Sequence, residues 1–228
     1  MFKFAVLVAG CAAYASAAKI VCDVHAFDKA AGDVLLYGGG ASAPNTFAQL
    51  DAKCASERKS LKFAEDYTEN CVHGLGKGML KIFIEGAGNE VSKHCTAGPM
   101  KNKYIRLAPC INQKAAAEIF KCNNMLAAIL EGTTAHPKKN RVPLSCCYMN
   151  EYVNCVVKHA SKCGKETTDF AHEIINTVAG DLLDTVCTKY KSNSRECRAL
   201  PKVTPAASPK YKSLLPPLAD VLDSLGSQ

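Results

Sequence analysis

Thirteen cysteines constrain this chain of 228 residues more than any other feature of its sequence. The N-terminus combines Lys3, an apolar run and small residues in an A-x-A pattern, which predicts a signal peptide over residues 1–18 that is cleaved after Ala17 or Ala18. Cleavage removes Cys11 and leaves an even number of cysteines. In a secreted, extracellular protein an even number predicts six disulfides, although the pairing stays open. The remaining cysteines are Cys22, Cys54, Cys71, Cys95, Cys110, Cys122, Cys146, Cys147, Cys155, Cys163, Cys187 and Cys197.

Two alternatives to a secreted disulfide protein find less support. A zinc site is not expected, because the chain has no C-x-x-C pair and its histidines lack ligand spacing. No other metal and no cofactor is expected either. The N-terminal apolar run is shorter than the roughly 20 residues that span a bilayer, so we expect no transmembrane segment.

Hydrophobic periodicity predicts an all-α fold, a disulfide-stapled helical bundle within residues 45–200. No stretch alternates like a strand for more than a few residues. An irregular N-terminal arm, residues 19–44, should be tied down by Cys22, and a proline-rich tail, residues 201–228, should end in a short amphipathic helix docked on the domain. The predicted helices cover residues 45–70, 79–94, 113–131, 144–161 and 167–188, with a loop at 132–143.

The cysteine spacing also indicates an internal repeat. Cys54, Cys71 and Cys95 recur 92 positions later as Cys146, Cys163 and Cys187. Under the same offset "IFIEGAGNEVSKHC" falls on "IINTVAGDLLDTVC". We interpret this as two diverged copies of one helical unit, with halves at 45–131 and 144–200, against the alternative of a chance match.

The segment SCCYMNEYVNC, residues 145–155, is similar to the active-site helix of secreted phospholipases A2, where paired cysteines precede a catalytic histidine and aspartate. Here Asn150 and Glu151 follow instead, and an amide cannot act as a general base near neutral pH. We therefore predict a structural role. Cys146 and Cys147 point about 100° apart on a helix and should bridge to different elements, with Cys155 as a third link.

A family resemblance rests on "VPLSCCYMNEYVNCV", "CGKETTDFAHEIINTVAGDLLDTVC" and "RECRALP". Together these segments resemble arthropod secreted, cysteine-rich helical proteins and are loosely similar to the insect haemolymph glycoproteins. The resemblance covers about residues 45–201 and implies an extracellular all-α protein.

The positive charge is concentrated near the C-terminus. Without Lys3 the chain holds 27 Lys and Arg against 21 Asp and Glu, and residues 189–212, with seven basic residues against Glu196, account for the whole excess. An acidic glycan is the candidate partner for this basic patch, and nucleic acid is not expected because the patch has few aromatic residues for stacking. The basic patch comprises Lys189, Lys191, Arg195, Arg198, Lys202, Lys210 and Lys212.

These observations predict a secreted, non-enzymatic protein that binds an extracellular ligand or partner on a durable helical scaffold. The alternative is a secreted toxin or signalling factor, in which the "KKNR" segment at 138–141 would be cut by a processing protease. A hydrolase without a recognisable motif is a third alternative, although the chain lacks H-E-x-x-H, G-x-S-x-G and P-loop motifs.

We expect the mature chain to begin at Ala18 or Lys19 and to contain no free thiol, because loss of Cys11 leaves an even number of cysteines. N-terminal sequencing and thiol titration of the secreted protein under denaturing, non-reducing conditions would test this. One reactive thiol per chain would contradict it.

Overall fold

The structure is a computed structural model that describes residues 20–35 and 37–223, and this part of the chain is mostly helical and contains no strands. The predicted signal peptide lies outside the described residues. The helices are α1 (Val24–Val34), α2 (Phe47–Cys71), α3 (Gly74–Cys95), α4 (Pro99–Lys114), α5 (Ala116–Thr133), α6 (Lys138–Ala160), α7 (Lys165–Val186), α8 (Arg195–Arg198) and α9 (Leu215–Asp223), with a 3-10 turn η1 (Ser161–Cys163) after α6.

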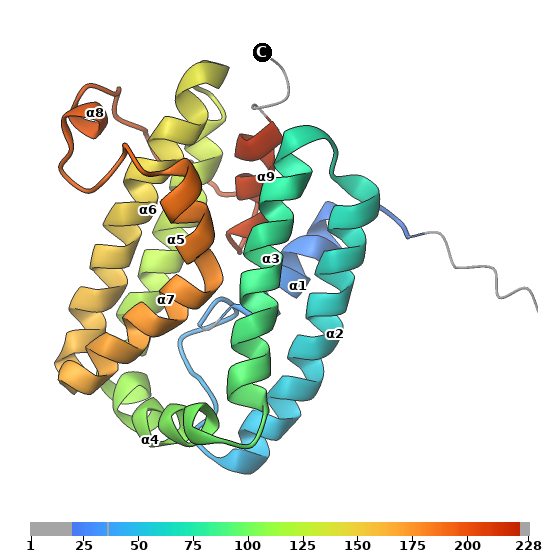
Figure 1. The fold of residues 1–228 in the computed structure, drawn as a ribbon, viewed down its shortest axis with the longest axis vertical. Helices are drawn as coiled ribbons and strands as arrows, with labels where there is room; N and C mark the ends of the chain where they lie inside the picture. The colour runs from blue at the N-terminus through green and yellow to red at the C-terminus, as the bar shows by residue number, and fades with distance from the viewer. Residues whose placement is uncertain (1–19, 36, 224–228) are drawn as a thin grey trace, which may run out of the picture.

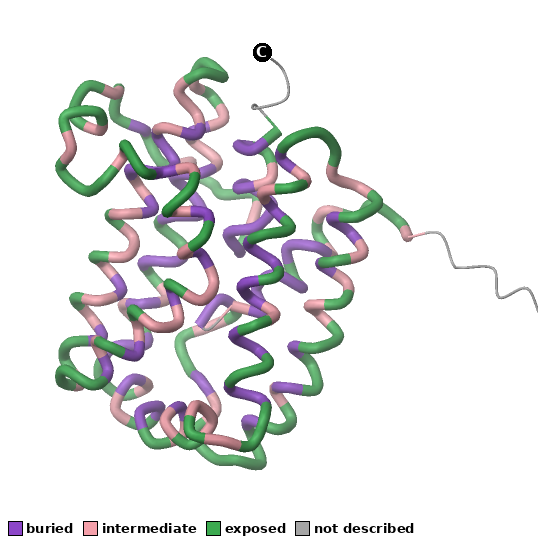
Figure 2. Tube along the Cα trace, viewed as in Figure 1, coloured by how far each residue is buried: buried purple, intermediate pink, exposed green. Residues whose placement is uncertain are grey.

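The helices form two groups that pack side by side (Figure 1). We call α1, α2 and α3 the first unit and α5, α6 and α7 the second unit. α4 lies across one end of the molecule, and α9 lies between the units at the other end (Figure 1). Buried residues follow the inner faces of the helices, as Figure 2 shows. The predicted all-α, disulfide-stapled fold is confirmed.

The prediction of an irregular arm over residues 19–44 is wrong, because it contains α1. Asp23 caps this helix by accepting hydrogen bonds from the backbone N–H groups of His25 and Ala26. Phe27 lies on the inner face of α1 and stacks on Tyr67 of α2, with ring centroids 4.3 Å apart. The predicted anchoring by Cys22 is confirmed by a disulfide to Cys71.

The prediction of one helix over residues 113–131 is wrong. This range covers the last two residues of α4 and most of α5. Ala115 has φ −129° and ψ −30°, which breaks the chain direction between α4 and α5. α4 itself was not predicted, although Tyr104, Leu107, Ala108 and Ile111 have helical spacing and are buried.

The predicted loop at 132–143 is shorter than expected, because α6 already begins at Lys138. Pro143 lies inside this helix, where it leaves the carbonyl of Lys139 without its usual donor. Lys139 is exposed to solvent, so water can satisfy that carbonyl. The KKNR segment therefore lies in the first turn of a helix, and the Arg141 side chain donates a hydrogen bond to the His136 carbonyl.

All six predicted disulfides form, and α6 carries three of them. Cys146 and Cys147 bridge to different elements, as predicted, and Cys155 provides the third link. The segment that resembles a phospholipase helix is thus the most cross-linked helix among the described residues. The pairs are Cys22–Cys71, Cys54–Cys95, Cys110–Cys163, Cys122–Cys155, Cys146–Cys187 and Cys147–Cys197.

Each disulfide lies on one side of the division between the two units. Two of them lie within residues 22–95 and the other four lie within residues 110–197. Among the described cysteines, none links the first unit to the second. Packing and hydrogen bonds alone therefore hold the units against each other.

The offset of 92 residues relates the helices as well as the cysteines. Adding 92 to the bounds of α2 and α3 gives 139–163 and 166–187, while α6 with η1 covers 138–163 and α7 covers 165–186. Cys54–Cys95 and Cys146–Cys187 are equivalent pairs, each with a sequence separation of 41. The common origin of the two units stays a prediction.

The units meet most extensively where α3 crosses α7. Gly86 is the point of closest approach, because a Cβ atom there would lie 2.7 Å from the carbonyl oxygen of Thr177 and closer still to that of Val178. Gly86 and Val178 are themselves related by the offset of 92. Equivalent positions of the two units thus contact each other, as they would at a twofold axis.

The tail holds both units together. It runs without helix from residue 199 to 214, and the Asp28 carboxylate on α1 accepts hydrogen bonds from the backbone N–H groups of Lys212 and Ser213 at 2.8–3.1 Å. The Glu131 carboxylate on α5 accepts two more from Lys210 and Tyr211. α9 then buries Leu218, Val221 and Leu222, which confirms a terminal helix docked on its own domain; Leu225 lies outside the described residues.

Two glycines of α3 provide a test of the crossing. Gly86→Ala should lower the free energy of unfolding by about 1–3 kcal/mol, because its Cβ would collide with the backbone of α7. Gly78→Ala is the matched control: a Cβ there meets nothing within 4 Å, so the change should raise stability by up to about 1 kcal/mol. Denaturant unfolding of both variants would measure the difference, and equal effects would contradict the close contact.

Candidate functional site

Three ionisable side chains are buried together between α2 and α3. Glu57, Glu90 and His94 are only 3 to 5% exposed, and we call them the acid–histidine cluster. Glu57 follows Cys54 by three residues and Glu90 precedes His94 by four, so both pairs share a helix face. The Cys54–Cys95 disulfide joins the two faces and fixes the cluster at this point.

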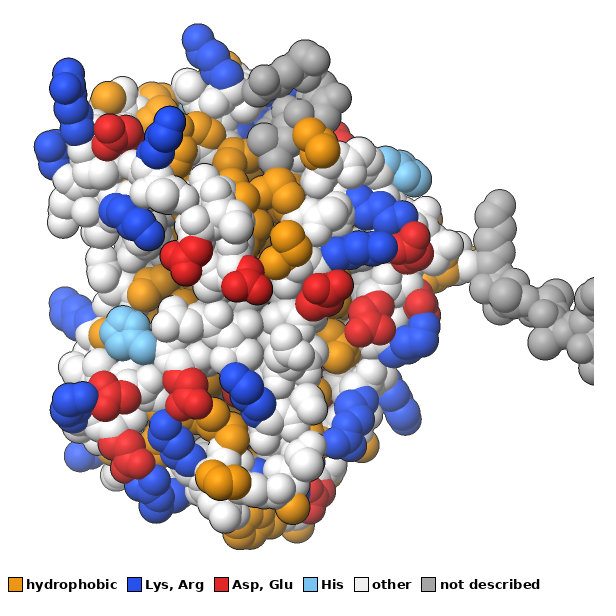
Figure 3. Space-filling model, in the orientation of Figure 1, with side chains coloured by type: hydrophobic (Ala, Val, Ile, Leu, Met, Phe, Trp, Pro, Cys, Tyr) orange, Lys and Arg blue, Asp and Glu red, His pale blue; other side chains and the backbone are white. Residues whose placement is uncertain are grey.

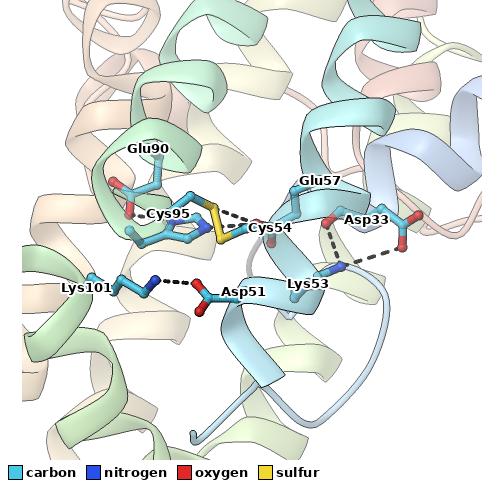
Figure 4. The surroundings of a disulfide bond; sticks show 9 residues. Asp33, Asp51, Lys53, Cys54, Glu57, Glu90, Cys95 and Lys101 are labelled. Carbon is cyan, nitrogen blue, oxygen red and sulfur yellow. Dashed lines mark hydrogen bonds and ion pairs between the residues drawn. A yellow bond between two sulfur atoms is a disulfide. The ribbon is translucent and has the colours of Figure 1, made fainter. Parts of the chain in front are cut away.

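The histidine lies between the two carboxylates. His94 Nε2 is 2.9 Å from Glu57 Oε2, and Nδ1 is 3.4 Å from Glu90 Oε1. Figure 4 shows both glutamates beside the disulfide, flanked by the ion pairs Lys101–Asp51 and Lys53–Asp33 nearer the surface. Since both ring nitrogens face carboxylates, both are placed to donate, which favours the imidazolium form.

The cluster holds two acidic groups and one basic group. Burial would lower the pKa of His94, but the hydrogen bonds to Glu57 and Glu90 and their charges outweigh it and raise the pKa to about 9. One imidazolium then faces two carboxylates. Glu90 Oε2 is buried and has no hydrogen-bond donor among the described residues.

Aromatic side chains cover the histidine. The ring of Tyr104 on α4 stacks on His94 with centroids 5.5 Å apart, and Phe170 on α7 meets Tyr104 edge-on. Burial raises the pKa of Tyr104, so its hydroxyl stays neutral. The cluster therefore has one aromatic wall and adds no further charge there.

An apolar cavity of about 70 Å³ opens beside Glu90 and His94. It lies at the junction of the two units, and we call it the interhelical cavity. Most of its walls come from α3, α6 and α7, with Val34 of α1, Leu35 and Leu214 completing them; the lining includes Phe83, Ala87, Met149, Ile174, Ile175 and Val178. A second, more polar pocket of about 220 Å³ adjoins Glu57 and Tyr104.

The second unit fills the equivalent positions with apolar residues. Adding 92 to Glu57, Glu90 and His94 gives residues 149, 182 and 186, which are methionine, leucine and valine. Met149, Leu182 and Val186 lie beside the equivalent disulfide and line a small apolar void of about 20 Å³. This arrangement of helices thus packs well without buried charges, so the cluster is a specific feature of the first unit.

The geometry of the cluster does not favour metal binding. Ligand atoms of Cys54, Glu57, His94 and Cys95 lie within 4.8 Å of one another, as do those of Cys122, Cys155 and His159. In both groups the cysteines form a disulfide, and a disulfide offers no thiolate to a metal.

The predicted basic patch extends from the end of α7 through α8 into the tail. All seven of its side chains are exposed, as expected for a solvated segment. Arg195 and Arg198 belong to α8, which Cys147–Cys197 attaches to α6. Lys210 and Lys212 instead line a wide groove of about 940 Å³ beside α1, together with Lys29. Binding of an acidic glycan to these residues stays a prediction.

The exposed face in Figure 3 carries both signs of charge, with apolar side chains gathered near α9.

The acid–histidine cluster was not predicted from the sequence. Glu90, His94 and Cys95 lie close together in the chain, but nothing local shows that the two ionisable residues are buried. The offset of 92 could have shown it, because it aligns Glu57, Glu90 and His94 with three apolar residues.

Comparisons with protein-family models, curated proteins and solved structures found no match to this chain. The resemblance to arthropod cysteine-rich helical proteins therefore stays a prediction. Within the described residues, no helix is both long and apolar enough to cross a membrane.

The cluster predicts a loss of stability at alkaline pH. The folded-state pKa of His94 is about 9 against 6.5 for a free histidine, so its contribution is complete below pH 6.5 and is lost as the pH rises through 9. The full contribution is on the order of 3 kcal/mol.

Between pH 6 and pH 9.5 the free energy of unfolding should fall more in wild type than in His94→Gln. Denaturant unfolding with blocked thiols would measure this, with exposed His73→Gln as the control. Parallel pH profiles of wild type and His94→Gln would contradict it.

Proposed function

We propose that this protein is a secreted, non-enzymatic binding protein that holds a small, mainly apolar ligand in the interhelical cavity. The observation that carries the proposal is an apolar cavity with one acidic end, at the junction of two separately cross-linked units. Ligand sites in helical proteins commonly lie between helices and combine apolar walls with a few polar groups.

The size of the cavity limits the ligand. A dry cavity of about 150 Å³ accommodates benzene, so about 70 Å³ suits a group of only a few carbon atoms. Leu35, Ile174 and Val178 line the cavity and are only partly buried. A longer ligand can therefore extend past these side chains toward solvent.

The covalent connectivity supports entry of a ligand. Each unit is stapled internally, while the α3–α7 interface has no disulfide across it among the described cysteines. Small displacements of one unit against the other can widen the cavity without distorting either unit. The six disulfides, worth about 2–4 kcal/mol each, would preserve both units in the extracellular environment.

The cluster is poorly arranged for catalysis. A general base requires a free nitrogen within reach of the substrate, yet both nitrogens of His94 already face carboxylates. This supports a binding protein over a hydrolase. The toxin or signalling alternative gains no support from residues 138–141, because processing there would require the first turn of α6 to unfold.

Binding to the cavity can be tested with small probes. Chemical shifts of the secreted, oxidised protein should change on adding xenon or dichloromethane, at methyl groups of Ala87, Met149 and Ile175. Ala87→Leu should fill the cavity and abolish these changes. Native mass spectrometry and solvent extraction of the secreted protein would then search for the natural ligand.

The control is a variant that enlarges the cavity. Ile175→Ala should cost about 2–5 kcal/mol of stability and admit benzene, which wild type should exclude. This variant keeps the test decisive if Ala87→Leu fails to fold. Probe-induced shifts that are absent in wild type, or that persist unchanged in folded Ala87→Leu, would overturn the proposal.

A further inference from the structure

Glu90 lies at the acidic end of the interhelical cavity, and one of its carboxylate oxygens has no hydrogen-bond donor among the described residues. Glu90 is 5% exposed and lines the cavity, and its Oε1 atom faces His94 Nδ1 at 3.4 Å. Its Oε2 atom has no donor among the described residues. A buried carboxylate oxygen without a donor is costly, so a donor supplied by a ligand would be favourable.

The charges around Glu90 specify what kind of donor fits. Glu57 and Glu90 both face His94, so the buried cluster holds two acidic groups and one basic group. The nearby cations Lys53 and Lys101 form ion pairs with Asp33 and Asp51. A cationic donor would pair with the second acidic group as well as satisfy its oxygen, whereas a neutral donor would satisfy only the hydrogen bond.

The second unit shows that packing at the position of Glu90 does not require a charged residue. Leu182 occupies the position equivalent to Glu90, beside the equivalent Cys146–Cys187 disulfide, and it is buried like Glu90. A leucine therefore satisfies the packing at this place in the helical arrangement. The glutamate places a charge against the cavity that packing alone does not require.

We propose that Glu90 binds the ammonium group of a small amine, whose apolar body occupies the interhelical cavity against Phe83, Ala87 and Ile175. This inference rests on the proposed function, because it names the ligand class of the same cavity. The Glu90 carboxylate accepts the hydrogen bond from the ammonium group. His94 and Glu57 hold Glu90 in place from the other side.

A series of probes with the same carbon chain tests the ligand class. Isothermal titration at pH 7 would compare n-butylamine, n-butanol and 2-butanone, which offer a cationic donor, a neutral donor and an acceptor. The amine should bind about 10-fold more tightly than the alcohol, because hydrogen bonds to charged groups are the stronger ones. The ketone should bind least tightly.

Glu90→Gln is the matched variant, since it keeps the shape of the side chain and removes the charge. It should reduce amine affinity about 10-fold and leave alcohol affinity within about twofold. Glu85→Gln, an exposed glutamate on the same helix, should change neither. If Glu90→Gln does not fold, the wild-type preference for amine over alcohol decides alone.

The outcomes distinguish the two proposals. Equal affinity for amine and alcohol, preference for the ketone, or an unchanged amine affinity in Glu90→Gln would overturn the amine inference and leave a binding cavity. If the amine, the alcohol and the ketone all fail to bind, and xenon and dichloromethane cause no chemical-shift change, both the binding cavity and the amine inference are overturned.

Discussion

The contact between α3 and α7 at Gly86 determines how the two units of this protein meet. Because residue 86 has no side chain, the backbones approach so closely that a methyl group would collide with two carbonyl oxygens of α7. The interhelical cavity is lined from the adjoining turns of both helices, by Phe83 and Ala87 on one side and Ile174 and Val178 on the other. The cavity and its acidic end therefore depend on a crossing that no disulfide enforces.

Burying two carboxylates and a histidine would destabilise most cores, and the surrounding structure shows how this one accommodates them. The Cys54–Cys95 disulfide holds the two helix faces together despite the repulsion between Glu57 and Glu90. Each carboxylate contacts the imidazole, and Tyr104 covers the ring. The second unit avoids the problem by placing a methionine, a leucine and a valine at the equivalent positions. This contrast within one chain makes the cluster the strongest candidate for function.

Local sequence signals predicted the helical class, the number of disulfides and the docked terminal helix, because periodicity and an even cysteine count need no tertiary information. α1 was missed although Asp23 and the spacing of Phe27, Ala31 and Val34 indicate it, because the glycines that follow suggested an irregular arm. The break at Ala115 carries no glycine or proline and depends on how α4 and α5 pack. Disulfide pairing and the burial of Glu90 depend on which helices become neighbours, which the sequence alone does not specify.

The confinement of every disulfide to residues 22–95 or to residues 110–197 has a consequence for biosynthesis. In the secreted form that we propose, the cysteines at 22, 54, 71 and 95 can pair before the later ones have emerged into the oxidising compartment, since no partner from residues 110–197 is required. The widest span of any pair is 53 residues, so oxidation can keep pace with translocation, unit by unit. Maturation would then end with a non-covalent step, when the last nine described residues, α9, insert between two units that are already oxidised.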